Sequence, residues 1–288
     1  MKGMKIMKIN DFKEFFDRKS KRFFIFLDID DIIKKPLEYS FFSGGKRLRP
    51  WIIYNIGRYY NVDEEKLLKI GFIIEIIHTA SLIHDDLPAI DNSEYRRGNK
   101  TNHKKFSEWQ AILTGDLGFI LPFKLFSDFD INESYLLNSF FSETLLNLIE
   151  GEALDVAFEK KLLNPSKDDI KKMYVKKTSS LFEFSFACIP LILNKNDDFK
   201  LLKIAGENFG VSFQIYDDIK DKFGNFEEVG KDLNNDINKI TFLNIFSVME
   251  AKKYADSLFK ETLSILSELK IFKFIEYLEE IKSIIERK

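Results

Sequence analysis

The chain has 288 residues, of which 45% are hydrophobic and 31% are charged, with 44 Lys and Arg set against 46 Asp and Glu. This apolar content is enough to bury a sizeable core, which excludes disorder as the main state. The formal net charge of −2 gives no electrostatic reason to expect binding to nucleic acid. Only 13 Gly and 6 Pro are present, too few for the turns of a sandwich or barrel, so we expect an all-α protein of long helices.

The expected helices follow one another along the chain. One helix starts within residues 11–16, and the paired glycines at 44–45 then break the chain before Pro50, which suits a first helical turn. Residues 61–86 begin with three acidic side chains and continue with apolar ones on nearly every face, which predicts a buried helix. Further helices are expected over 107–127, 132–158, 168–193, 198–222, 237–249 and 251–286. No change of composition marks a boundary, so we expect one domain over 1–288.

Three features bear on the compartment. Cys188 lies in an apolar run and is expected to be a buried structural thiol. The amino terminus alternates Lys with Ile and Met and has no apolar stretch of signal-peptide length. No window of about 18 residues is apolar and free of charge, so no membrane span is expected. We therefore expect a cytoplasmic protein.

Two acidic clusters carry the chemical information in this sequence. The first is His84-Asp-Asp-Leu-Pro-Ala-Ile-Asp91 and the second is Tyr216-Asp-Asp-Ile-Lys-Asp221, and each follows an apolar helical run. Crowded carboxylates repel one another and are tolerated chiefly when cations pair with them. Asp217 and Asp221 stand at i and i+4 on one helix face, and Pro88 could turn the chain so that Asp91 returns towards Asp85. Hard oxygen ligands with little His indicate Mg²⁺, which uses one or two carboxylates plus substrate phosphates.

Basic residues accompany both clusters. Lys46, Arg47 and Arg49 lie beside two glycines, Arg96 and Arg97 follow the first cluster, and Lys231 and Lys239 follow the second. Arginine forks and lysine charges are suited to a diphosphate, whose oxygens Mg²⁺ can bridge to carboxylates. Together these residues predict two anion sites, one bridged by metal and one free of metal.

With these acidic and basic motifs, the sequence resembles the trans-prenyl diphosphate synthases, in particular the bacterial farnesyl and geranylgeranyl diphosphate synthase group. The resemblance runs over about residues 40–245 and rests on motifs in the family's order and spacing. These motifs are Gly44-Gly-Lys-Arg-Leu-Arg-Pro50, Ile77 to Asn92, Arg96-Arg-Gly98, Thr101-Asn-His-Lys104, Gly115-Asp116, Lys177-Thr178 and Phe213 to Asp221. Glu152 stands where the family usually has Gln, and Ser179 stands where it commonly has Gly.

The resemblance implies a role for each matching residue. The residues that would hold the diphosphate of isopentenyl diphosphate are Lys46, Arg49, His78 and Arg97. Those that would ligate or support the metal are Asp85, Asp86 and Asp91 on one side and Asp217, Asp218 and Asp221 on the other. Those that would grip the allylic diphosphate are Arg96, Lys177 and Lys231, with Lys239 assisting. The carbonyl of Lys177, Thr178 and the amide of Gln214 would face the allylic cation.

The resemblance also implies the reaction and the architecture. A dimethylallyl, geranyl or farnesyl diphosphate would ionise, the double bond of isopentenyl diphosphate would attack the cation, and a proton would leave. The cofactor would be Mg²⁺, as about three ions with bound diphosphate, with Mn²⁺ as an alternative. The fold would be an isoprenoid-synthase-type bundle of long antiparallel helices around a deep central cavity, and the protein would be a homodimer.

The length of the product depends on side chains one turn before the first acidic cluster. If the growing chain runs along the helix away from Asp85, it first meets Ala80 and Ser81. Relatives with short products carry a bulky aromatic residue at one or both positions, and here both are small. We therefore expect a product longer than geranyl diphosphate, either farnesyl or geranylgeranyl diphosphate.

Three alternatives stay open at this point. A class I terpene cyclase would share the metal-assisted ionisation but would not need the isopentenyl site. An inactive regulatory subunit of a prenyl synthase would be expected to lose one acidic cluster, and both are present. An HD-type metal phosphohydrolase is suggested by His78, His84-Asp85 and Asp217, but it needs another histidine upstream of His78, and the sequence has none.

Overall fold

The computed structural model of the protein describes residues 6–223 and 239–287. Nearly all of these residues are helical, and the strands among them are β1 (Tyr95–Arg96) and β2 (Asn99–Lys100), which form a short antiparallel hairpin. The all-α class predicted from the scarcity of Gly and Pro is therefore confirmed. The described chain divides into two compact units, residues 6–134 and residues 135–223 with 239–287. Whether they act as the single domain expected from the sequence stays a prediction.

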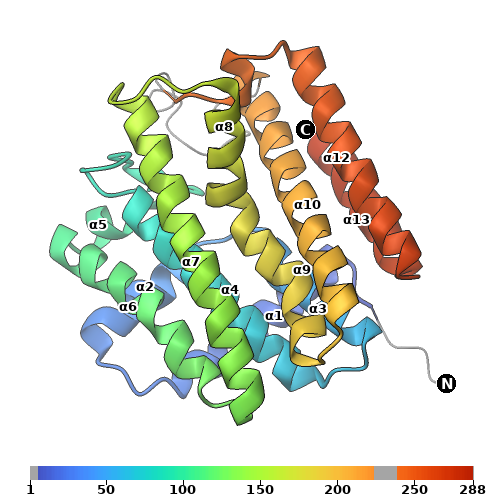
Figure 1. Ribbon diagram of the computed structural model, residues 1–288. Helices are drawn as coiled ribbons and strands as arrows, with labels where there is room; N and C mark the ends of the chain where they lie inside the picture. Colours follow the sequence, from blue (N-terminus) through green and yellow to red (C-terminus); the bar gives the residue numbers. More distant parts are fainter. Residues whose placement is uncertain (1–5, 224–238, 288) are drawn as a thin grey trace. The chain divides into compact units, whose positions relative to one another are not determined.

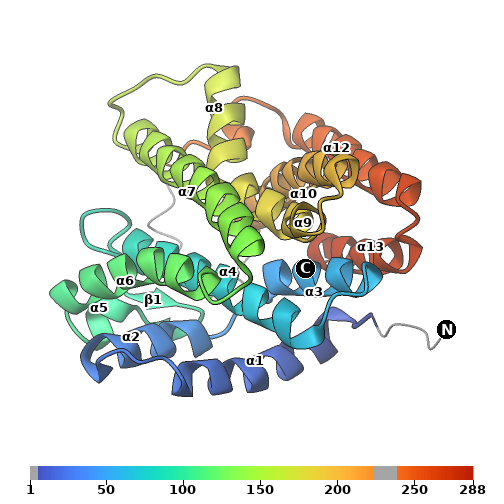
Figure 2. The same ribbon diagram turned by 60° about the horizontal axis from the view of Figure 1, so that its bottom comes forward.

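The first unit is built around α4. Figure 2 shows α4 between α3 and α6, and α1 and α2 also contact it. Asp63 caps this helix by accepting from the backbone N–H of Lys66 at 3.1 Å, so the acidic start predicted from the sequence is confirmed. The helices of this unit are α1 (Ile9–Ile25), α2 (Asp31–Phe42), α3 (Leu48–Tyr59), α4 (Glu64–Asp85), α5 (Asn102–Lys105) and α6 (Glu108–Phe126).

The apolar character of α4 follows from its burial. It is the helix among the described residues that is long and apolar enough to cross a membrane, and 72% of its most apolar window is buried inside the protein. Such burial is the usual property of a core helix that has neighbours on every face.

A buried arginine joins three helices of the first unit. Arg47, in the left-handed region at φ 53°, is only 2% exposed. Its Nε donates to Asp17 of α1 at 2.7 Å and its Nη1 donates to Glu75 of α4 at 2.8 Å. Its Nη2 donates to the carbonyl of Phe41 in α2 at 2.6 Å. Arg47 is therefore a structural cation, whereas the sequence grouped it with the anion-binding residues around it.

The second unit packs in the order α9, α10, α12, with α10 in the middle (Figure 1). Helix α7 (Ile131–Glu159) begins at the end of the first unit and continues into the second. The other helices of this unit are α8 (Lys167–Tyr174), the π-helix η1 (Val175–Ser179), α9 (Ser180–Ile192), α10 (Asn196–Phe223), the 3₁₀ turn η2 (Phe242–Asn244), α12 (Val248–Glu268) and α13 (Phe272–Arg287).

Several helix predictions need correction. The span 168–193 is interrupted by the π-helix, and 251–286 is two helices because the chain turns at Lys270, whose φ is 61°. In the described part of 237–249 the chain forms a 3₁₀ turn and not a long helix, so that prediction is wrong. Helix α2 was not predicted, because Pro36 lies inside its short sequence.

We expect Arg47→Met to lower the free energy of unfolding by about 3–5 kcal/mol, because Glu75 is left as an uncompensated buried charge. Equilibrium urea unfolding measures this change. Lys19→Met is the matched control, since it removes an exposed ion pair with Glu65 and should have a much smaller effect. Equal losses from the two variants would contradict the structural role of Arg47.

Candidate active site

The first acidic cluster is a loop that turns back on the end of α4. The backbone N–H of Asp91 donates to the carbonyl of Asp85 at 2.9 Å, and that of Asn92 donates to Leu87 at 3.0 Å. Asn92 adopts φ 49°, a left-handed conformation that Asn tolerates. The return of Asp91 to Asp85 that Pro88 suggested is therefore confirmed for the backbone.

Asp86 is paired with an arginine of the β1 strand. Arg96 Nε donates to both carboxylate oxygens, at 2.8 and 2.9 Å, and Nη2 lies 2.7 Å from Oδ1. Burial raises the pKa of Asp86, whose residue is 3% exposed, and Arg96 opposes that rise. Both carboxylate oxygens of Asp86 therefore face Arg96.

Two glycines make room for the next arginine. Gly44 and Gly45 have φ +114° and +122°, where side chains are strained. A Cβ at Gly45 would lie 2.7 Å from Nη1 of Arg97, and that same Nη1 donates to the carbonyl of Gly44 at 2.6 Å. The loop glycines thus bring the Arg97 guanidinium against the backbone that precedes Lys46.

Arginines gather around His78, which is half-buried on α4. Burial lowers the pKa of His78 well below its usual value, and the nearby guanidinium groups, Arg49 and Arg97 first, lower it further. Burial also lowers the pKa of Arg49 to about 10, with Arg97 contributing and Glu75 opposing. The structure therefore brings Arg49, His78 and Arg97 together, as the sequence predicted, in a place where an anion would relieve the repulsion between cations.

A small open pocket adjoins this group at Arg97. Its wall includes Asp86, Arg96 and Arg97 together with hydroxyl-bearing side chains of α2 and α4. Lys46, exposed on the loop, does not line it, and neither do Arg49 and His78. The pocket therefore lies on the Arg96 side of the first acidic cluster.

The second acidic cluster lies near the end of α10. Asp217 and Asp221 are one turn apart on the same helix face, as expected. Asp218 accepts from Gln214 Nε2 at 3.0 Å and from the hydroxyl of Tyr174. Burial raises the pKa of Asp218 to about 7, the two hydrogen bonds oppose the rise, and the neighbouring carboxylates add to it. Asp218 is thus a supporting residue like Asp86.

The π-helix carries Lys177 and Thr178 and is fixed in place by glycines. A Cβ at Gly151 of α7 would lie 2.2 Å from the Lys177 nitrogen, and one at Gly210 of α10 would lie 2.6 Å from Cα of Ser179. The backbone of the turn can approach both helices only because these residues are glycine. π-Helical turns of this kind frequently occur at functional sites.

Lys177 and Thr178 of this turn already have partners within the protein. The Lys177 ammonium is paired with Asp155 and lies 2.7 Å from Glu152, both on α7. The Thr178 hydroxyl donates to Oε1 of Gln214 at 3.0 Å. The structure thus brings Thr178 and Gln214 together, as predicted. The Lys177 ammonium faces two carboxylates of α7.

Two predicted residues belong to the part of the chain at the gap between residues 223 and 239. Lys231 lies outside the described residues, and Lys239 lies where the described chain resumes. The sequence analysis missed Tyr174 and the pairing of Asp155 with Lys177. The spacing of Gly151 and Asp155, one helical turn apart, could have suggested the pairing, but nothing in the sequence marks Tyr174.

The proposed chain-length residues differ in their surroundings. Ala80 is fully buried, and a Cβ on Gly118 of α6 would lie 2.5 Å from that of Ala80. Ser81 is half-buried, and its hydroxyl donates to the carbonyl of His78 at 3.0 Å. A large side chain at position 80 would therefore collide with α6, whereas position 81 has more room.

The donor sets fit a magnesium ion that is shared with a substrate. Within residues 6–223 and 239–287, no three His, Cys, Asp or Glu side chains converge as a preformed metal cage. Each cluster instead offers two carboxylates beside a supporting one, Asp85 and Asp91 or Asp217 and Asp221. Mg²⁺ is usually bound by one or two carboxylates, with phosphates and water completing its octahedron.

His84 does not belong to this chemistry. Its ring stacks on Phe119, its Nε2 lies 3.0 Å from the carbonyl of Ile112, and a Cβ at Gly115 would overlap it. His84 therefore joins α4 to α6, which explains the glycine at 115. The phosphohydrolase alternative loses the histidine on which it depended.

Two helices that each carry a carboxylate cluster near their end, with arginines beside the first cluster, are typical of the trans-prenyl diphosphate synthases. The model of the family described as Polyprenyl synthetase matches residues 30–276, and the chain belongs to this family.

Individual relatives agree with the family. The chain is 34% identical to a farnesyl diphosphate synthase of Micrococcus luteus, over 82% of this chain and 83% of that protein. It is 35% identical to a geranylgeranyl diphosphate synthase of Saccharolobus solfataricus, over 78% and 69%. Among solved structures, a geranyltranstransferase of Thermotoga maritima is 36% identical with TM-score 0.85, over 96% of this chain and 98% of that one. A Helicobacter pylori geranyltransferase complexed with magnesium and isoprenyl diphosphate is 29% identical with TM-score 0.81, over 96% and 97%.

Proposed function

We infer that the chain is a short-chain trans-prenyltransferase that joins isopentenyl diphosphate to an allylic diphosphate and releases diphosphate. The observation that carries this inference is the loop after α4, where Asp91 returns to Asp85 and, despite burial, the carboxylates of Asp86, Asp85 and Asp91 raise the pKa of Arg96. Relatives named for farnesyl and geranylgeranyl diphosphate support the same reaction class. A terpene cyclase would not need the cations around His78, and an inactive subunit would be expected to lose one acidic cluster, whereas this chain has both.

The diphosphate of isopentenyl diphosphate would bind to Lys46, Arg49, His78 and Arg97. Arg97 contributes to the lowered pKa of Arg49, and burial together with these guanidinium groups keeps the pKa of His78 low. A neutral imidazole can donate one hydrogen bond without adding to the repulsion. An anion with several oxygens would accept from the guanidinium forks and relieve the crowding.

The residues that would bind the allylic diphosphate are Arg96, Lys177 and Lys231, with Lys239 assisting. Mg²⁺, when bound, supplies charge that stabilises the departing diphosphate. Asp85, Asp91, Asp217 and Asp221 would hold it, as about three ions with bound diphosphate, and Asp86 and Asp218 would support these carboxylates. Lys177 would bring its ammonium to the leaving oxygen while Asp155 and Glu152 hold the rest of its side chain.

The allylic cation would face uncharged oxygen atoms of the π-helix and α10. Thr178 and Gln214 are joined by their hydrogen bond, which fixes the amide orientation. With the carbonyl of Lys177 they would present negative ends of dipoles to the cation, which stabilises positive charge without capturing it. The released diphosphate would take the proton.

We expect labelled isopentenyl diphosphate to be incorporated with dimethylallyl, geranyl or farnesyl diphosphate only when Mg²⁺ is present. Asp85→Asn and Asp217→Asn should each lower the rate by about 100-fold or more, because charge on the leaving group is no longer balanced. Asp128→Asn, in an exposed ion pair with Lys69, is the matched control and should not change the rate.

Other outcomes separate the alternatives. Consumption of the allylic substrate without isopentenyl diphosphate would identify a cyclase, and binding without turnover would identify an inactive subunit. Metal-independent incorporation would contradict the role given to the carboxylates.

For the product, we propose farnesyl or geranylgeranyl diphosphate, because Ala80 and Ser81 are small. Ser81→Phe should shorten the product, since the ring would occupy the space one turn below Asp85. Chromatography of the dephosphorylated products measures the length. Ala80→Tyr is the less informative variant, because the side chain would displace α6 at Gly118.

Ser257→Phe, the same substitution on the exposed face of α12, is the control for this experiment. A Ser81→Phe enzyme with the product profile of the wild type would refute the tunnel assignment.

We propose that the protein is a cytoplasmic homodimer. Helix α6 exposes an apolar face that a second copy would cover, made of Trp109, Ile112, Leu113 and Ile120 at helical spacing. Sedimentation equilibrium should therefore give the mass of a dimer, and Ile120→Glu should shift it to the monomer. Ile204→Glu, at an exposed position of α10, should leave the dimer intact. A wild type that sediments as a monomer at micromolar concentration would overturn this assignment.

A further inference from the structure

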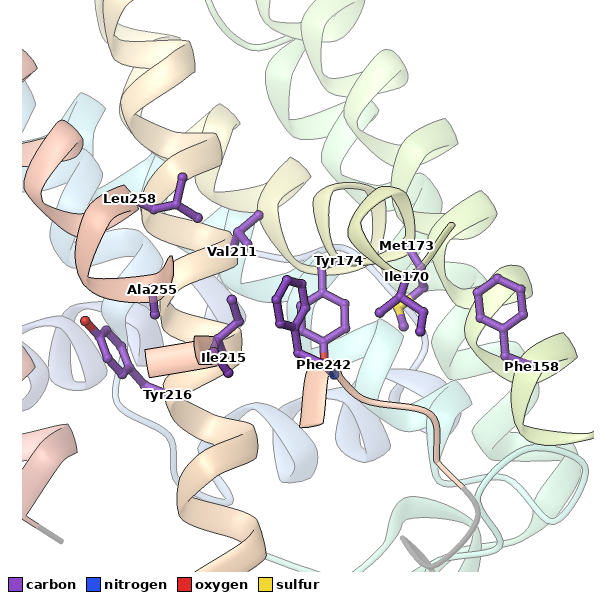
Figure 3. Packing of buried hydrophobic residues seen from close by; sticks show 11 residues of the cluster. Phe158, Ile170, Met173, Tyr174, Val211, Ile215, Tyr216, Phe242, Ala255 and Leu258 are labelled. Atoms are coloured by element: carbon purple, nitrogen blue, oxygen red, sulfur yellow. The ribbon is translucent and has the colours of Figure 1, made fainter. Parts of the chain in front are cut away.

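Tyr174 lies where three segments of the second unit meet. It is the last residue of α8, and the residue is 3% exposed. Its hydroxyl donates to the Asp218 carboxylate of α10 and accepts from the backbone N–H of Phe242 in η2 at 2.9 Å. Figure 3 shows the rings of Tyr174 and Phe242 beside one another, with their centroids 5.6 Å apart.

The direction of these hydrogen bonds is fixed by the number of protons. The Phe242 N–H can only donate, so the single hydroxyl proton of Tyr174 goes to Asp218. On the other side of Asp218, the Thr178 hydroxyl donates to Gln214 Oε1, and Gln214 Nε2 donates to Oδ1 of the Asp218 carboxylate at 3.0 Å. In this chain of hydrogen bonds, Asp218 is therefore the final acceptor, and it accepts from Gln214 and from Tyr174.

We propose that Tyr174 is a positioning residue whose hydroxyl fixes the Asp218 carboxylate and thereby sets the second acidic cluster relative to Thr178. The inference rests on the proposed function, because it gives a purpose to a group that supports a metal-binding face. Tyr174 acts through Asp218 and is not itself a catalytic residue.

The hydroxyl and the ring of Tyr174 have separable roles. The ring packs in an apolar cluster with Ile170, Met173, Ile215 and Phe242, and phenylalanine would keep this packing. Loss of the hydroxyl would remove one of two donors to Asp218 and would leave the buried Phe242 N–H without its acceptor. A partly buried carboxylate depends strongly on such donors for its orientation.

The test is Tyr174→Phe, with Tyr254→Phe as the matched control. Tyr254 of α12 stacks on the same Phe242 ring, with centroids 5.5 Å apart, but is partly exposed. Tyr174→Phe should lower kcat by about 10–100-fold, while the KM for isopentenyl diphosphate stays within about twofold because that substrate is held elsewhere. It should also reduce the rise in melting temperature that Mg²⁺ with inorganic diphosphate gives to the wild type, and Tyr254→Phe should leave both readouts unchanged.

A double-mutant cycle with Asp218→Asn tests the route of the effect. If Tyr174 acts through Asp218, then Tyr174→Phe should change kcat by less than about threefold in the Asp218→Asn background. The four proteins are compared at a temperature where far-ultraviolet circular dichroism shows all of them folded. An unchanged kcat in Tyr174→Phe, or independent multiplicative effects of the two substitutions, would overturn the proposal.

A further measurement separates this proposal from the proposed function. Absence of Mg²⁺-dependent incorporation by the wild type would defeat the function but not the pairing of Tyr174 with Asp218. Urea unfolding of the same four proteins measures the coupling between the two residues without any substrate. Zero coupling in that cycle would overturn the positioning role, whatever the wild type catalyses.

Discussion

The rest of this structure depends on one constraint: the charged groups at the ends of its apolar helices must each be compensated by a partner. Crowded carboxylates and crowded guanidinium groups both raise the energy of a protein unless each finds a partner. The first cluster meets this requirement by pairing Asp86 with Arg96, and the second meets it with neutral donors to Asp218. In each cluster the middle carboxylate is therefore held in place by side chains of the protein.

The same constraint explains the neighbouring arginines at 47 and 49. Arg47 faces inward to Asp17 and Glu75, so its charge is compensated by the protein. Arg49 lies near Arg97, and their mutual repulsion is part of what lowers the pKa of Arg49. Two arginines of one sequence motif therefore differ in their surroundings. Arg47 is compensated by two carboxylates, whereas Arg49 lies near a second guanidinium group.

Much of the fold could be predicted because its signals are local. The acidic start of α4 and its apolar faces depend on a few neighbouring residues, and so does the return of Asp91 after Pro88. The break at Lys270 is also local, since the Ile271 N–H donates to the Leu266 carbonyl at 2.9 Å, but it was missed because a lysine takes the left-handed position where glycine is the usual signal. The π-helix could not be predicted in this way, since Gly151 and Gly210 of two other helices lie against it. Tyr174 escaped for the same reason, because its partners are 44 and 68 residues away in the chain.

The π-helix between α8 and α9 has a consequence for how this site can change. A π-turn contains one residue more than the α-helical turn it replaces, so the residues on its two sides are out of helical phase by about 100°. Removing one residue from 175–179 would restore ordinary helical pairing, and the local backbone would gain regularity. It would also rotate Lys177 and Thr178 away from Asp155 and Gln214. The irregular turn therefore sets the helical phase of this segment: a less favourable backbone conformation determines the direction of the Lys177 and Thr178 side chains.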